Sequence, residues 1–168
     1  MTYEYHTFPR AGFIRRFASY VYDLLLAIAV YMIAGAITYG IFGVLFAQGI
    51  IQTHGFEHAI DLKNSSMLYR VLVDGFALVA VAYFFVYFWA RSGQTLGMKA
   101  WRLRVQNQDG TLISKATGFK RLVPTLLGLG NLLVIFDVKN KLSLQDRVTG
   151  TEVVVLSLEA NKGRHWVN

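Results

Sequence analysis

Arg16 and Asp23 are the first residues of this sequence whose chemistry needs an explanation. Asp23 is the single charged residue in a long apolar stretch, residues 17–47. A carboxylate is costly to bury in such a stretch, so it must face protein or water and have a partner. Because a helix returns to the same face after seven residues, Arg16 and Asp23 share one stripe, about 10 Å apart along the axis. That separation predicts a further polar group between or opposite them.

A second candidate site is the pattern H-x-x-E-H formed by His54, Glu57 and His58. In inverted zinc peptidases, a helix with this pattern presents two imidazoles and a carboxylate. Gly55 weakens the required helix, and no third ligand follows at a suitable spacing. We therefore expect a solvated loop, with an adventitious metal or proton site as the alternative.

The composition excludes several classes of function. The chain has no cysteine, which excludes disulfides, thiolate metal sites and cysteine nucleophiles. It has neither a nucleophile elbow nor a phosphate loop, so we expect no enzyme activity, no catalytic residues and no cofactor. The net charge is +7, but the basic residues flank apolar segments, where they attract anionic lipid head groups. A bilayer is therefore the expected partner, and nucleic acid is not.

The apolar segments predict one integral membrane domain over residues 1–168. The sequence is 54% hydrophobic and 16% charged, which is poor in charge for a soluble domain. The first span is predicted at residues 17–47, in a helix that begins near Phe13, and its length exceeds a hydrocarbon core of roughly 30 Å. The second span is predicted at residues 71–90. Asp74, near its start, is either a solvated or capping carboxylate or part of an ion path.

Small residues recur at intervals of three or four along the first span, at Ala36, Gly40, Gly43 and Ala47. Small side chains let another helix approach closely. This face is expected to pack against the chain's own second span or, alternatively, to form a dimer interface. Two spans are few for a transporter, so transport would favour a homo-oligomer with the pathway between subunits.

The connection after the second span, residues 91–121, is basic and is therefore expected in the cytoplasm together with the amino terminus. Within it, residues 101–113 predict a small β-hairpin, because turn signals follow an alternation of bulky and basic residues. A further strand is expected at residues 151–158, in the tail that comprises residues 137–168. Since a short sheet needs more than two strands, these segments are expected to pair.

The third apolar segment, residues 122–136, is shorter than a normal span and contains Pro124, Gly128, Gly130 and Asn131. If it crossed the membrane, it would separate the two strand-forming regions. We therefore favour a re-entrant or interfacial segment, with a shortened third span as the alternative. The predicted fold is mainly α: two full spans, this short membrane segment and a small cytoplasmic β-hairpin or sheet.

Three motifs in order resemble the RDD family of small bacterial and archaeal membrane proteins, which is named for one arginine and two aspartates. They are Arg16 with Asp23, the run Gly93-Gln-Thr-Leu-Gly-Met-Lys99, and Leu144-Gln-Asp146 before Thr149-Gly-Thr-Glu-Val-Val. By this resemblance, Arg16, Asp23 and Asp146 are the family's named residues. Gln145 departs from the pattern, because the family commonly has histidine there. The resemblance implies a multi-pass protein of the bacterial inner membrane, with a transport function for which sodium/proton exchange is suggested.

The residues themselves predict a mechanism beside this resemblance. Asp146 is expected to approach the Arg16 end of the first helix, so that Asp146 and the deeper Asp23 share one arginine. A carboxylate in a low dielectric can exchange a proton for a cation. Gln94 and Thr95 would add neutral oxygens suited to sodium, with Lys99 and Asp74 as supporting residues. The alternative is a scaffold or accessory subunit, in which the same cluster pins the cytoplasmic loops to the helices.

Overall fold

The computed structural model describes residues 4–162 and divides the chain into two compact units. The first unit is built from the residues up to 25 together with those from 84 onward, and the second from residues 26–83. The outer ends of the predicted leader and tail, residues 1–3 and 163–168, lie outside the described residues. The two long helices each contribute to both units.

Both predicted spans are confirmed as helices. Within residues 4–162, α1 (Phe13–Ala47) and α3 (Met67–Ser92) are each long and apolar enough to cross a membrane. α1 begins at Phe13, as predicted, and α3 extends past both predicted limits. Gly93 ends α3 because its φ of 71° is left-handed, a conformation that glycine adopts without strain.

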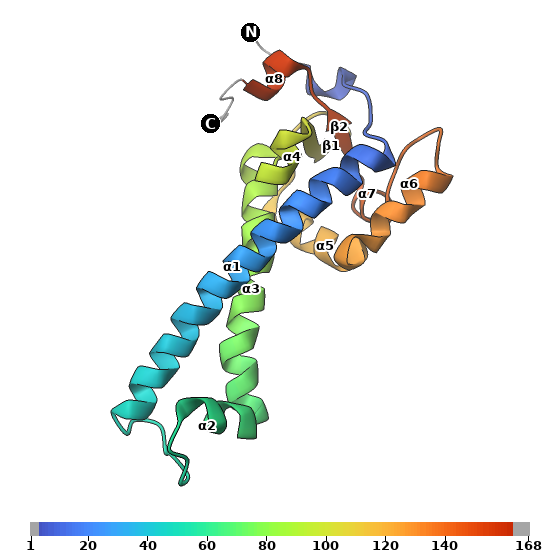
Figure 1. Cartoon of the computed structure of the whole chain (residues 1–168). Helices are drawn as coiled ribbons and strands as arrows, with labels where there is room; N and C mark the ends of the chain where they lie inside the picture. Colours follow the sequence, from blue (N-terminus) through green and yellow to red (C-terminus); the bar gives the residue numbers. More distant parts are fainter. Residues whose placement is uncertain (1–3, 163–168) are drawn as a thin grey trace. The chain divides into compact units, whose positions relative to one another are not determined.

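The shorter elements are mostly helical (Figure 1). They are η1 (Tyr5–Thr7), α2 (Ala59–Ser65), α4 (Leu96–Ala100), α5 (Lys115–Thr125), η2 (Leu126–Leu132), α6 (Leu133–Phe136), α7 (Leu144–Thr149) and α8 (Leu158–Lys162). The fold is therefore mainly α with a small sheet, as predicted. The third apolar segment is broken: α5 and residues 128–136 form two arms bent by 82°.

In the second unit, α1 and α3 approach at small and hydroxyl residues. A Cβ added to Gly35 would lie 4.0 Å from the Ala77 Cβ. The Thr38 hydroxyl lies 3.2 Å from the Val73 carbonyl of the facing helix, and the Phe42 ring packs against Tyr69. These positions follow the helical repeat, so they define one face of α1.

The predicted packing of Gly40 and Gly43 against the second span is wrong. A Cβ added to either glycine would meet no atom within 4 Å, and Ala36 and Ala47 are exposed. Gly35, Thr38 and Phe42 make the contact instead, because they lie on another stripe of the same helix. The face that contains Gly40 is therefore open in the unit.

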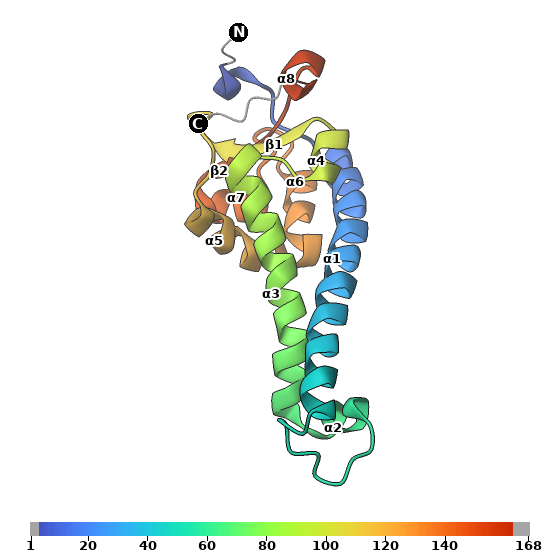
Figure 2. The same ribbon diagram turned by 90° about the vertical axis from the view of Figure 1, so that its left-hand side faces the viewer.

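The sheet of the first unit pairs strands that are far apart in sequence. β1 (Leu103–Asn107) lies antiparallel to β2 (Thr151–Val155), with Val105 opposite Val153 (Figure 2). Residues 9–11 extend the other edge of β2: Ala11 N–H donates to the Val153 carbonyl, and Val155 N–H donates to the Pro9 carbonyl. This edge supplies the third paired segment that a small sheet needs.

The predicted pairing of the two strand regions is confirmed, but the hairpin within residues 101–113 is wrong. A turn does form, with Asn107 N–H donating to the Thr111 carbonyl. However, the second edge of β1 is already occupied, because Val105 N–H donates to the Gly93 carbonyl. The chain after the turn buries Ile113 in the core instead, beside Met98 and Leu103.

Candidate functional site

Asp146 is held at the start of α7 by reciprocal hydrogen bonds with Ser143. The Ser143 side chain accepts a hydrogen bond from Asp146 N–H, and the Asp146 carboxylate accepts one from Ser143 N–H. This reciprocal pair is a capping box, which satisfies two donors at the beginning of the helix. Gly150, with φ at 65°, ends α7 in the left-handed conformation. The local sequence therefore fixes the orientation of the carboxylate.

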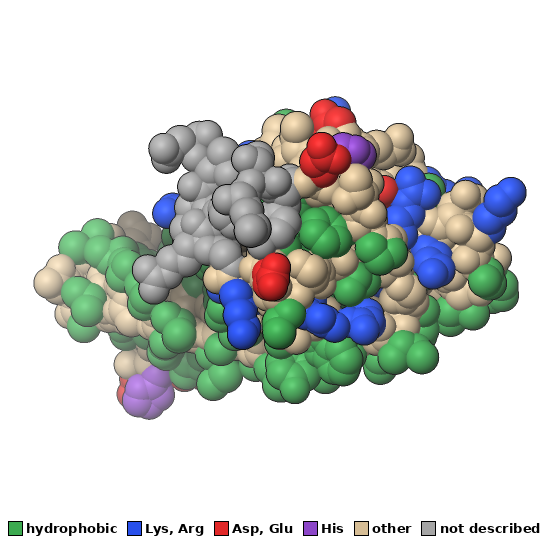
Figure 3. Space-filling model, turned by 90° about the horizontal axis from the view of Figure 1, so that it is seen from above, with side chains coloured by type: hydrophobic (Ala, Val, Ile, Leu, Met, Phe, Trp, Pro, Cys, Tyr) green, Lys and Arg blue, Asp and Glu red, His purple; other side chains and the backbone are tan. Residues whose placement is uncertain are grey.

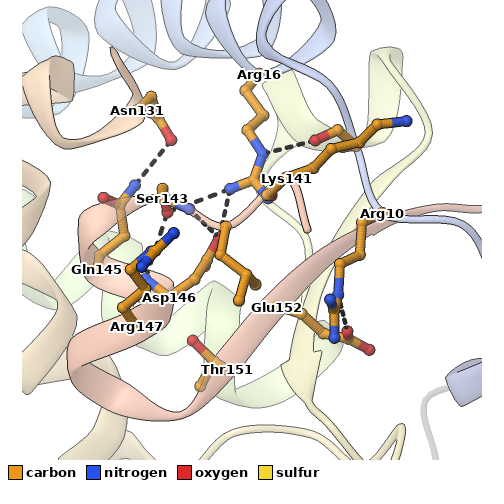
Figure 4. A network of polar contacts seen from close by, with 12 residues as sticks. Arg10, Arg16, Asn131, Lys141, Ser143, Gln145, Asp146, Arg147, Thr151 and Glu152 are labelled. Carbon is orange, nitrogen blue, oxygen red and sulfur yellow. Dashed lines mark hydrogen bonds and ion pairs between the residues drawn. The ribbon is translucent and has the colours of Figure 1, made fainter. Parts of the chain in front are cut away.

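Two arginines from other elements bind this carboxylate. Arg16 of α1 donates to Asp146 Oδ2 at 2.7 Å, and Arg121 of α5 donates to Oδ1 at 2.9 Å. All three side chains are buried. Figure 4 shows Arg16 and Ser143 converging on Asp146 from different segments. Asp146 thus joins α1, α5 and α7 within the first unit.

Arg16 is satisfied on every side of its guanidinium group. Its Nε donates to the Ala11 carbonyl at 3.1 Å, and its second terminal nitrogen donates to the Lys141 carbonyl at 2.9 Å. A further contact of 3.3 Å reaches the Ser143 hydroxyl. Because a planar guanidinium has donors in fixed directions, these contacts orient it as well as neutralise it. Arg16 therefore ties the start of α1 to the segment before α7.

Arg121 is the site residue that the sequence reasoning missed. Besides Asp146, it donates to the hydroxyls of Thr149 and Thr151, and its guanidinium lies 5.8 Å from the centre of the Trp89 ring. Its Nε is buried and has no hydrogen-bond partner among the described residues. A signal existed in the sequence, because Arg121 immediately precedes the third apolar segment. A charged residue at such a boundary is either solvated or paired, and the neighbouring sequence does not identify its partner, which lies 25 positions away.

The charges of this cluster keep Asp146 ionised. Burial by itself raises the pKa of the Asp146 carboxyl. The positive charges of Arg16 and Arg121, with hydrogen bonds from Ser143, outweigh burial and hold the pKa below its ordinary value. The cluster therefore contains two positive charges and one stable negative charge. This arrangement suits a structural lock better than a group that exchanges protons.

Asp23 does not share Arg16, so the predicted pair of carboxylates on one arginine is wrong. The Thr95 hydroxyl donates to Asp23 Oδ2 at 2.6 Å, and Gly97 N–H donates to Oδ1 at 3.0 Å. Among residues 4–162, no Lys or Arg forms an ion pair with Asp23. The carboxylate instead caps the amino end of α4, where unpaired N–H groups favour a negative charge. Asp23 and Asp146 thus belong to separate sites.

Gly97 makes the approach of α4 to α1 possible. A Cβ at this position would lie 2.5 Å from Asp23 Oδ1 and 2.6 Å from the Ser19 carbonyl. Thr95 is equally constrained: while its hydroxyl donates to Asp23, the same oxygen accepts from Met98 N–H at 3.1 Å. The motif at residues 93–99 is therefore explained by its contact with α1.

The remaining predicted residues lie apart from these contacts. The Gln94 amide donates to the Leu103 carbonyl and to Asn161, and Lys99 is exposed. Asp74 belongs to the second unit, where it pairs with Lys63 at 2.8 Å. The Gln145 side-chain amide donates to Asn131 at 2.8 Å, while its Oε1 is buried with no partner in the part of the chain that the structure describes.

The H-x-x-E-H pattern lies in a turn. His54 and Gly55 both have positive φ, and α2 begins only at Ala59, with His58 as its N-cap. The helix that the motif requires is therefore not formed by these residues. Within residues 4–162, no group of three His, Cys, Asp or Glu side chains is arranged to hold a metal ion.

A family model described as RDD family matches residues 10–150. The chain belongs to the RDD family. No curated protein and no solved structure matches it. The RDD family match contains α1, α3 and the whole of α7, so Arg16, Asp23 and Asp146 all lie within it.

The structure gives the three residues of the RDD resemblance different surroundings. Arg16 and Asp146 contact each other, whereas Asp23 contacts the motif at residues 93–99. Each of the three sequence motifs is thus used to fasten α1 to the polypeptide that follows α3. In this RDD family chain, the first unit is assembled around the start of α1.

Proposed function

We propose that this protein is a small membrane transporter that exchanges a cation, such as sodium, for a proton. The observation that carries the proposal is the carboxylate of Asp23. It is buried within a spanning helix, and its hydrogen-bond donors, Thr95, Gly97 and Ser19, are neutral. A carboxyl group without a fixed counter-ion can bind either a proton or a cation. Asp23 is therefore the exchanging group in this proposal.

The cluster of Arg16, Asp146 and Arg121 has a different role in the proposal. A carboxylate held by two arginines is already neutralised and binds a cation poorly. The cluster acts as the lock that fixes the start of α1, and so fixes Asp23 against α4. Within the motif at residues 93–99, Thr95 and Gly97 contact Asp23, whereas Gln94 ties the motif to Leu103 and Lys99 is exposed.

The proposal includes an orientation and an assembly. The basic residues gather in the connection at residues 91–121, which supports a cytoplasmic location for the first unit and the amino terminus in the bacterial inner membrane. The open face at Gly40 and Gly43 supports close contact with another helix. A homo-oligomer would then place the pathway between subunits.

A scaffold or accessory subunit is the second candidate function. It is favoured by the number of contacts that Arg16 makes: Ala11, Lys141, Ser143 and Asp146 all bind it. Such a network fastens the loops to the helices whether or not an ion moves. In this role the protein would hold a partner and transport nothing.

Flux measurement in proteoliposomes separates the two functions. Purified protein is reconstituted with an imposed sodium or proton gradient, and wild type is compared with Asp23→Asn and with Asp74→Asn as the matched control. Asp23→Asn should abolish flux, because the amide cannot exchange a proton. Asp74→Asn should retain most of it, since Asp74 pairs with Lys63 in the other unit.

Gel filtration and thermal unfolding establish that each variant is folded. Flux that persists in folded Asp23→Asn would reject Asp23 as the exchanging group. Absence of sodium, potassium and proton flux in folded wild type would reject exchange and favour the scaffold.

A further inference from the structure

We propose that residues 115–138, from α5 to just beyond α6, form a lipid-binding surface that enters the bilayer from the side of the first unit and returns to that side. We call these residues the α5–α6 segment. The proposal concerns membrane topology and lipid contact, and it stands whether or not the protein transports an ion. It rests on four observations in the first unit.

The first observation is the register of the sheet. β1 precedes the α5–α6 segment in the sequence, and β2 follows it. The strands pair directly, with Leu103 opposite Val155 and Asn107 opposite Thr151. Paired strands lie on one side of a membrane, because a hydrocarbon core does not accommodate an open two-stranded sheet. A single crossing between β1 and β2 is therefore excluded by their pairing.

The second observation is that both ends of the segment are fastened to the same unit. At its beginning, a Cβ on Gly118 would lie 3.1 Å from Val86 of α3, and Arg121 binds Asp146. At its end, Asp137 binds Arg147 at 2.8 Å and accepts from Leu142 N–H. The bend of 82° between the two arms lets the chain leave and return.

The third observation is the outward face of the segment, which is apolar. Phe136 is 82% exposed, Val123 76% and Val138 73%. The segment exposes further large apolar side chains, namely Phe119, Leu129, Leu132 and Ile135. In contrast, Gly118, Arg121 and Pro124 turn toward the unit and are buried. An exposed apolar face of this extent marks a surface that is covered by something other than water.

The fourth observation identifies the cover as lipid. Exposed lysines adjoin the exposed apolar residues in the sequence: Lys120 follows Phe119, and Lys139 and Lys141 come just after Val138. The two acids near it, Asp137 and Asp146, are each neutralised by arginine. Figure 3 shows basic side chains lying beside hydrophobic ones on one face of the molecule. An apolar centre with a basic margin complements acyl chains beneath anionic head groups.

The position of this surface in the chain supports the same occupant. The first unit includes the first turns of α1 and the last turns of α3, so it adjoins the membrane that these helices enter. Irregular backbone such as η2 is tolerated at membrane depth where it is packed against protein. A dipping segment thus satisfies both the apolar exposure and the strand pairing.

Single-cysteine labelling tests the topology, and the chain has no native cysteine to interfere. Asp109→Cys lies before the segment, Glu159→Cys after it, and Glu57→Cys between the two spans; all three positions are exposed. A membrane-impermeant maleimide is applied to sealed vesicles of known orientation. Asp109→Cys and Glu159→Cys should label from the same side, and Glu57→Cys from the opposite side. Labelling of Asp109→Cys and Glu159→Cys from opposite sides would overturn the proposal in favour of a third span.

Fluorescence quenching tests the lipid contact. An environment-sensitive fluorophore is attached at Val123→Cys or Phe136→Cys, with Asp109→Cys as the matched control, in vesicles that contain phosphatidylglycerol and nitroxide-labelled lipid. The first two should show a blue-shifted emission and a loss of intensity, while the control keeps both. Folding is checked by gel filtration, and these exposed sites tolerate substitution. Emission typical of water and no quenching at Val123 and Phe136 would overturn the proposal and indicate a protein-docking face.

Discussion

At the scale of single residues, Asp23 and Asp146 have different binding partners, although the sequence predicted that they would share one arginine. Asp146 is bound by two arginines, and Asp23 by two hydroxyls and a backbone N–H. A carboxylate between two cations is neutralised as well as stabilised in its charged form, whereas neutral donors stabilise it without supplying an opposite charge. The same residue type therefore serves as a structural lock in one place and as the proposed exchange group in the other.

Asp146→Asn should destabilise the fold strongly. The change removes both ion pairs and leaves Arg16 and Arg121 buried without a counter-charge. Removal of one partner from a buried pair costs about 3–5 kcal/mol, so the loss in the free energy of unfolding should reach that range. Denaturant unfolding in detergent measures it. Exposed Asp61→Asn, at the start of α2, is the matched control and should lose less than about 1 kcal/mol. Equal losses in the two variants would refute the lock.

Acid should weaken the protein partly through Asp146. The pKa of this carboxyl is lowered in the folded state, and an unfolded aspartate titrates near about 3.9. Because the folded pKa is the lower one, the stabilisation is complete above the unfolded value and is lost as the pH falls through the folded value. The difference in unfolding free energy between wild type and Asp146→Asn should therefore stay constant down to about pH 5 and shrink below about pH 4. A difference that grows on acidification would contradict the lowered pKa.

At the scale of elements, α4 depends on one glycine. Gly97→Ala would place a methyl group against the Asp23 carboxylate and the Ser19 backbone, neither of which can retreat freely. Such overpacking costs about 1–3 kcal/mol, and the contact between α4 and α1 should loosen. Gly43→Ala is the matched control, because its added methyl group meets nothing within 4 Å and alanine favours a helix by about 1 kcal/mol. In thermal unfolding, the midpoint temperature should fall for Gly97→Ala and not for Gly43→Ala. A fall of equal size in both variants would show that Gly97 is not specially constrained.

At the scale of the whole molecule, segments distant in sequence build the first unit together. The unit combines the residues up to 25 with those from 84 onward. Cleavage of the chain between α1 and α2 would therefore place one half of the unit in each fragment. Their contacts include the edge at residues 9–11 and the Arg16–Asp146 pair. The unit therefore holds the start of α1 to the end of α3 through noncovalent contacts.

A protease site inserted after Gly55 tests this assembly. This segment is an exposed turn, where insertion is tolerated. After cleavage, the two fragments should remain associated in mild detergent, and gel filtration measures the association. Arg16→Met should weaken it by about 3–5 kcal/mol, because Asp146 loses a buried partner. Arg15→Met, which removes the neighbouring and less buried arginine, should leave it nearly unchanged. Separation of the cleaved wild-type fragments would disprove the shared unit.

The sequence by itself determined the features that depend on local pattern. The lengths of the apolar runs predicted α1 and α3, since a span is fixed by hydrophobicity over neighbouring residues. The position of Asp23 inside such an apolar run predicted that the carboxylate has a polar partner. The capping box of Ser143 and Asp146 is equally local, because its two bonds join residues three apart, but only the structure revealed it.

Only the tertiary structure decided which distant groups meet. Thr95 binds Asp23 across 72 positions, and Arg121 reaches Asp146 across 25. The edge of β1 was taken by Gly93 and not by the segment after the turn, so a hairpin that is plausible locally did not form. Such choices depend on competition among elements for the same donors and the same space, and no spacing within one segment encodes that competition.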